Sequence, residues 1–105
     1  MVKLNMKERI ELTNILPQQG DILTLRTGME ITGMMYPSNE EQVEFSVKNE
    51  NGMMSWNDKG ETEKEFSFSP LQIGLLKKQL KELDETKALK PLHISIYEKI
   101  MEGIA

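Results

Sequence analysis

Apolar residues recur at helical spacing near both ends of the chain. The first pattern covers residues 5–16, where Asn5 and Glu8 have the spacing of a capping box and Pro17 follows the last apolar position. In a capping box, each of the two side chains accepts a hydrogen bond from the backbone N–H of the other residue. The segment is therefore predicted to form a helix that begins after Asn5 and ends before Pro17.

Two segments of the C-terminal half are also predicted to be helices. One begins at Ser69, which is followed by a proline and a glutamine at the first and third helical positions. Its apolar stripe consists of Leu71, Leu75, Leu76, Leu80 and Leu83. The other begins at Pro91 and ends at Gly103, and its inward residues are predicted to be Leu92, Ile96, Tyr97 and Ile100. The single histidine, His93, is expected to face the solvent.

The stretch 21–36 fits two patterns. A helix would place one set of residues on a common, buried face, namely Ile22, Leu25, Met29, Thr32 and Tyr36. The alternative is a pair of strands with a turn near Thr27 and Gly28, because the stretch contains two glycines and three threonines, which are poor helix formers. The helix is the preferred interpretation, and Pro37 ends the segment in either case.

A capping box at Ser38 and Glu41 predicts a short helix that ends near Phe45. A β-hairpin follows, because Asn51-Gly52 is the turn sequence that two-residue type I′ hairpins prefer.

The Asn51-Gly52 turn sets the register of the hairpin. It pairs Val47 with Trp56 and Asn49 with Met54 on one face of the strands. We expect this face to cover the core, with Trp56 buried against Leu76, Leu80 and Tyr97. Residues 62–68 are predicted to form a third strand.

These elements predict a single α+β domain over residues 1–105. It is mostly helical, with about five helices and a small antiparallel sheet of two or three strands. Three helices followed by a hairpin is the element order of winged-helix domains, in which the third helix enters the DNA major groove.

The charge distribution argues against binding of nucleic acid. Residues 40–65 contain eight acidic and three basic side chains, and the predicted helix after Ser38 contains three glutamates and no basic residue. Only Arg9 and Arg26 could make bidentate phosphate or base contacts. Because affinity for nucleic acid depends on neutralising phosphates, we do not expect such binding. A winged-helix-like nucleic-acid-binding protein is the alternative.

The sequence contains no recognised catalytic or cofactor-binding pattern. It has no cysteine and one histidine, and it lacks the glycine-rich phosphate loops and the GxSxG nucleophile motif. We therefore expect no enzyme activity, no cofactor, no metal site and no small-molecule substrate. The sequence also shows no signal segment and no apolar run of about 18 residues, which predicts a cytoplasmic protein without membrane contact.

Methionine is abundant, with eight residues that include two adjacent pairs. The preferred interpretation is that methionine fills irregular gaps in the core, and the alternative is an adaptable surface that contacts another protein or a second copy. The candidate contact residues are Met34, Met35 and Met53, since Met53 lies on the hairpin face opposite Trp56.

Several segments resemble a family of small phage and prophage proteins. The segments are residues 7–10 (KERI), 15–17 with Gly20, 22–25 (ILTL), 38–45 (SNEEQVEF), 55–57 and 92–100 (LHISIYEKI). The resemblance implies a phage or mobile-element context and assigns no functional residue. The resulting hypothesis is a small, non-enzymatic interaction or regulatory protein that binds a host or phage protein.

Overall fold

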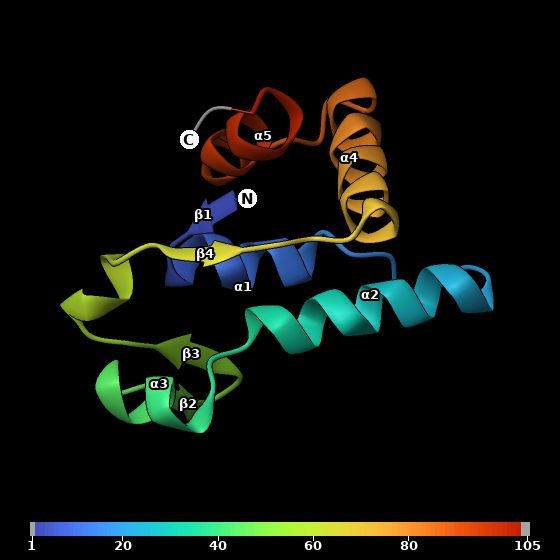
Figure 1. Cartoon of the computed structure of the whole chain (residues 1–105). Coiled ribbons are helices and arrows are strands. Elements are labelled where there is room, and N and C mark those ends of the chain that lie inside the picture. The colour runs from blue at the N-terminus through green and yellow to red at the C-terminus, as the bar shows by residue number, and fades with distance from the viewer. Residues whose placement is uncertain (1, 104–105) are drawn as a thin grey trace.

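The computed structural model describes residues 2–103, and its elements follow the predicted order with one strand added at the N-terminus (Figure 1). The N-terminal half contains β1 (Val2–Leu4), α1 (Met6–Asn14), α2 (Ile22–Met35) and α3 (Asn39–Glu44). The hairpin strands are β2 (Lys48–Glu50) and β3 (Met53–Ser55), and the 3-10 helix η1 (Asp58–Glu61) follows. The chain continues with β4 (Lys64–Phe66), α4 (Pro70–Glu85), the 3-10 helix η2 (Pro91–His93) and α5 (Ile94–Met101). The predicted α+β class is confirmed.

Side-chain caps define the beginnings of four helices. The capping boxes predicted before α1, α3 and α4 are all present. At α1, Oδ1 of Asn5 accepts a hydrogen bond from the N–H of Glu8 at 2.9 Å. The stretch 21–36 is a helix, as preferred, and its N-cap Asp21 accepts a hydrogen bond from the N–H of Thr24 at 2.7 Å.

The strands form two separate antiparallel pairs. In the hairpin, Asn49 is paired with Met54, as the turn predicts. The third strand, β4, does not extend the hairpin but pairs with β1, so that Val2 lies opposite Phe66. This pairing joins residues far apart in the sequence, and three-residue strands carry little periodicity from which to predict it.

The core lies where α1, α2, α4, α5 and the β1–β4 sheet meet. Its buried members are Leu4, Leu12, Ile15, Leu16, Ile31, Met35, Phe66, Leu76, Leu80, Ile96 and Ile100. The predicted stripe on α4 is partly wrong, because Leu71 at the start of that helix is exposed.

The predicted buried face of α2 is the wrong face. The helix buries Thr27, Gly28, Ile31 and Met35. Ile22 and Met29, on the opposite side, are 65% and 74% exposed. Both faces of this helix carry large apolar residues, so its own periodicity does not decide which face packs on the neighbouring helices.

The hairpin does not cover the core, contrary to the prediction. Together with α3 it stands apart from α4 and α5 (Figure 1). Trp56 is half-buried and packs on η1, where an added Cβ at Gly60 would lie 2.2 Å from Cδ1 of Trp56. Leu4 and Phe66 of the β1–β4 sheet are the strand residues that belong to the core.

His93 is buried, which corrects its expected exposure. The residue lies in η2, and α5 begins only at Ile94, so His93 is not on the regular helix that the sequence predicts. Its Nδ1 accepts a hydrogen bond from the N–H of Lys90 at 3.1 Å, which closes the turn before α5.

Candidate protein-binding surfaces

Among the described elements, α2 carries the largest number of exposed large hydrophobic side chains. Of the eight exposed large hydrophobic side chains among residues 2–103, three lie on α2, and Tyr36 directly follows this helix. A fifth, Leu71 of α4, lies across a groove from Leu23. We define the α2 surface as the exposed residues Ile22, Leu23, Arg26, Met29, Glu30 and Gly33.

The groove beside this surface runs between α2 and α4 and has a volume of about 250 Å³. Its lining residues are Leu23, Thr24, Thr27, Pro70, Leu71, Gly74, Leu75 and Lys78. The space beside Gly74 is open, because an added Cβ there would meet no atom within 4 Å apart from its chain neighbours and the backbone of its own helix. Lys78 is the only charged residue of the lining, so the groove suits an apolar side chain of a partner.

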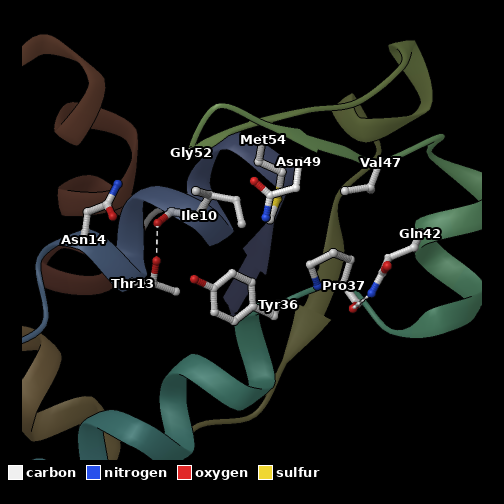
Figure 2. A pocket seen from close by; sticks show the side chains of 10 residues that line it. All are labelled: Ile10, Thr13, Asn14, Tyr36, Pro37, Gln42, Val47, Asn49, Gly52 and Met54. Atoms are coloured by element: carbon white, nitrogen blue, oxygen red, sulfur yellow. Dashed lines mark hydrogen bonds between the residues drawn. The ribbon is translucent and has the colours of Figure 1, made fainter.

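A larger cleft of about 590 Å³ separates α1 from the hairpin and α3. In Figure 2 the ring of Tyr36 lies between Thr13 of α1 and Pro37, below the side chains of Ile10, Asn49 and Met54. The lining residues are Ile10, Thr13, Asn14, Tyr36, Pro37, Gln42, Val47, Asn49, Gly52 and Met54, and none of these ten is charged. The cleft therefore suits an uncharged group.

The buried Arg9 of α1 connects this helix to the end of α2 and to α3. Nη1 of Arg9 donates to Oε2 of Glu41 at 2.8 Å, and Nε of Arg9 donates to the carbonyl of Met35 at 2.9 Å. The hydrogen bonds from Arg9 hold the pKa of Glu41 at about 2. Arg9 is therefore committed to internal contacts, and of the two arginines considered for phosphate contacts only Arg26 is exposed.

A second ionic cluster attaches α5 to α1. Nζ of Lys99 donates to Oε1 of Glu8 at 2.8 Å and also to Oε2 of Glu63. Burial alone would raise the pKa of Glu8, but the hydrogen bonds from Lys99 and from the N–H of Asn5 outweigh it and lower this pKa. Burial alone would lower the pKa of Lys99, and its two carboxylate partners raise it instead. Both groups therefore stay charged around neutral pH.

The structure separates the three methionines that the sequence singles out as contact residues. Met35 is fully buried in the core, so its assignment to a contact surface is wrong. Met34 is half-buried against the core, and Met53 on the hairpin is 76% exposed. Met29 is equally exposed but is not among the predicted contact residues, because the sequence pattern places it on the face of the helix that is expected to be buried.

Among residues 2–103, no helix is both long and apolar enough to cross a membrane. In the same range, no three His, Cys, Asp or Glu side chains are grouped so that they could hold a metal ion. Comparisons with protein-family models, curated proteins and solved structures found no match to this chain.

Proposed function

We propose that this chain is a non-enzymatic protein-interaction or regulatory protein and that the α2 surface is where it binds. The observation that supports this proposal most directly is the exposure of Ile22, Leu23 and Met29 on one helix. Scattered exposed apolar residues need no explanation, but several that share one helix beside an apolar groove are typical of interaction sites in soluble proteins. The groove next to Leu23 extends this patch onto α4.

The shape of the patch favours a helical partner segment. An amphipathic helix can lay its apolar residues along α2 and insert a side chain into the groove between Leu23 and Leu71. Complete burial of a side chain such as Ile22 or Met29 contributes about 1.5–3 kcal/mol. The resemblance to phage and prophage proteins favours a host or phage protein in the cytoplasm as a partner.

Two exposed methionines allow a matched test of this proposal. Met29 on α2 and Met53 on the hairpin are 74% and 76% exposed, so a glutamate at either position stays in water in the free protein. Tagged wild-type protein, Met29→Glu and Met53→Glu are used to capture proteins from host-cell extract, after circular dichroism has verified their folding. We expect the captured protein to be retained by the wild type and by Met53→Glu and to be lost with Met29→Glu.

Other outcomes would place the contact elsewhere. Loss with Met53→Glu alone would move the interaction to the hairpin, the contact that the sequence hypothesis names. If all three proteins capture the same partners, and Met29→Glu also leaves the oligomeric state unchanged, the α2 surface is not a binding site.

A further inference from the structure

The exposed side of α2 carries apolar residues together with one basic and one acidic residue, Arg26 and Glu30. Such a surface can bind a second copy of itself. Ile22, Arg26, Met29 and Gly33 recur at the spacing that aligns residues along one side of a helix, and all four are exposed. Arg26 and Glu30 lie one turn apart with opposite charges. We infer that this surface binds a second copy of the chain through antiparallel packing of α2 on α2 of the other copy. This inference rests on the proposed function, because it uses the same α2 surface, and it assigns a second copy of the chain to that surface in place of a host or phage protein.

Charge complementarity favours this occupant. In an antiparallel pair whose two-fold axis passes near residue 28, Arg26 lies opposite Glu30 of the second copy, and Glu30 lies opposite Arg26 of that copy. Symmetry makes the two contacts identical, as in any two-fold interface. A different protein would need a separate acidic and basic pair at matching positions, whereas a second copy supplies both.

The same register also matches the apolar residues. Met29 lies one residue from the axis, so the two Met29 side chains meet near the centre of the interface. Leu23 of one copy lies opposite Gly33 of the other, where an added Cβ would meet no described atom within 4 Å. The absence of a side chain at Gly33 thus leaves room for Leu23 of the second copy.

The size of the surface sets the expected affinity. A helix of 14 residues such as α2 is about 21 Å long. Two such helices in contact bury roughly 1,000 Å² in total, which is near the lower limit for a specific interface. We therefore expect a reversible dimer with a dissociation constant in the micromolar range, about 1–100 µM.

Charge reversal tests the register directly. Sedimentation equilibrium over roughly 1–500 µM brackets the expected affinity and measures the dimer of the wild-type protein. Arg26→Glu and Glu30→Arg should each weaken self-association about tenfold or more, because each variant places like charges opposite one another. An equimolar mixture of the two single variants should form a heterodimer, since every contact across the axis then joins opposite charges.

The control is a pair with the same chemistry on another helix. Lys81 and Glu85 of α4 form an exposed ion pair at the same i, i+4 spacing, with Nζ and Oε1 3.9 Å apart. Lys81→Glu and Glu85→Lys should leave self-association unchanged within about twofold. An equal loss in these control variants would mean that net charge, rather than the α2 surface, governs association.

The outcomes separate this inference from the function that it rests on. A wild-type protein that stays monomeric at the highest concentration, or a mixture of the single variants that does not associate, overturns the α2–α2 dimer. If Met29→Glu still loses a captured partner in that case, the α2 surface binds another protein and the proposed function stands. If Met29→Glu changes neither capture nor association, both proposals fail.

Discussion

Arg9 of α1 and Glu41 of α3 form an ion pair with 2.8 Å between Nη1 and Oε2, and Arg9 is only 2% exposed. The same guanidinium donates to the carbonyls of Met35 and Tyr36 and lies 5.2 Å from the centre of the Phe66 ring. Glu41 also accepts the N–H of the α3 N-cap, Ser38, at 3.0 Å. One side chain of α1 therefore joins the end of α2, the start of α3 and strand β4.

The first prediction follows from this pair. Arg9→Met should lower the free energy of unfolding by about 3–5 kcal/mol, because it removes the guanidinium that pairs with the largely buried Glu41 carboxylate and donates to two backbone carbonyls. Urea denaturation followed by circular dichroism measures the change. Arg26→Met, at an exposed arginine, is the control and should change stability by less than about 0.5 kcal/mol in dilute solution. Equal losses in both variants would contradict a specific role for the pair.

The second prediction concerns acid. The pKa of Glu41 is about 2 in the folded protein against 4.5 for a free side chain. A lowered folded pKa means that the stabilisation is complete above about pH 4.5 and is lost as the pH falls toward 2. The difference corresponds to about 3 kcal/mol, and the Glu41 side chain is only 14% exposed. Urea denaturation between pH 7 and pH 2 should show this decline.

Glu41→Gln provides the control for the acid prediction. The glutamine cannot be protonated in this range, so the decline should be smaller by most of the Glu41 contribution. A smaller decline remains in the variant, because the pKa of Glu8 is also lowered by Lys99 and the N–H of Asn5. An unchanged acid profile in Glu41→Gln would mean that other carboxylates cause the acid sensitivity.

Local sequence signals predict the beginnings of the helices well. Asn5, Ser38 and Ser69 each form the capping box that their sequence spacing indicates, since such boxes join residues only three apart. The Asn51-Gly52 turn likewise fixes the register of the hairpin, because both strands are adjacent in sequence. Interactions of this kind depend little on the rest of the fold.

Long-range packing explains the parts that sequence reasoning misses. The β1–β4 pairing and the Arg9–Glu41 pair each join distant parts of the chain, and no short pattern marks them. The inward face of α2 depends on α1 and α4, which select Ile31 over Met29. For this reason the α2 surface could not be predicted as a candidate site. The sequence pattern places Ile22 and Met29 in the core, whereas both side chains are exposed in the structure.

The third prediction contrasts two glycines. An added Cβ at Gly60 would lie 2.2 Å from the Trp56 ring, whereas one at Gly74 would meet no described atom within 4 Å. Gly60→Ala should therefore destabilise the protein by about 1–3 kcal/mol and shift the fluorescence of Trp56. Gly74→Ala, in the second turn of α4, should stabilise it by about 0.5–1 kcal/mol. Thermal unfolding and tryptophan fluorescence measure both effects, and stabilisation by Gly60→Ala would contradict the described packing of Trp56.

The fourth prediction concerns DNA and decides the alternative function. In a winged-helix domain the third helix presents basic side chains to phosphates, but α3 carries Glu40, Glu41 and Glu44, and Arg9 is buried against Glu41. We expect no micromolar binding of a labelled duplex at about 150 mM salt, because the affinity of such proteins depends on neutralising phosphates. Fluorescence anisotropy at about 20 mM and 150 mM salt measures it.

Charge reversal on α3 provides the positive control for the DNA experiment. Glu40 and Glu44 are both exposed, so Glu40→Lys with Glu44→Lys replaces two negative charges of this helix by two positive ones without loss of a buried contact. If repulsion by α3 is what prevents binding, the double variant should bind the duplex at about 20 mM salt and lose most of this affinity at 150 mM. Micromolar binding by the wild-type protein that weakens steeply with salt would instead revive the nucleic-acid hypothesis. In that case the DNA-binding surface would have to lie away from α3. Lys48 is exposed on the hairpin, so loss of binding in Lys48→Glu would place the DNA contact on the hairpin.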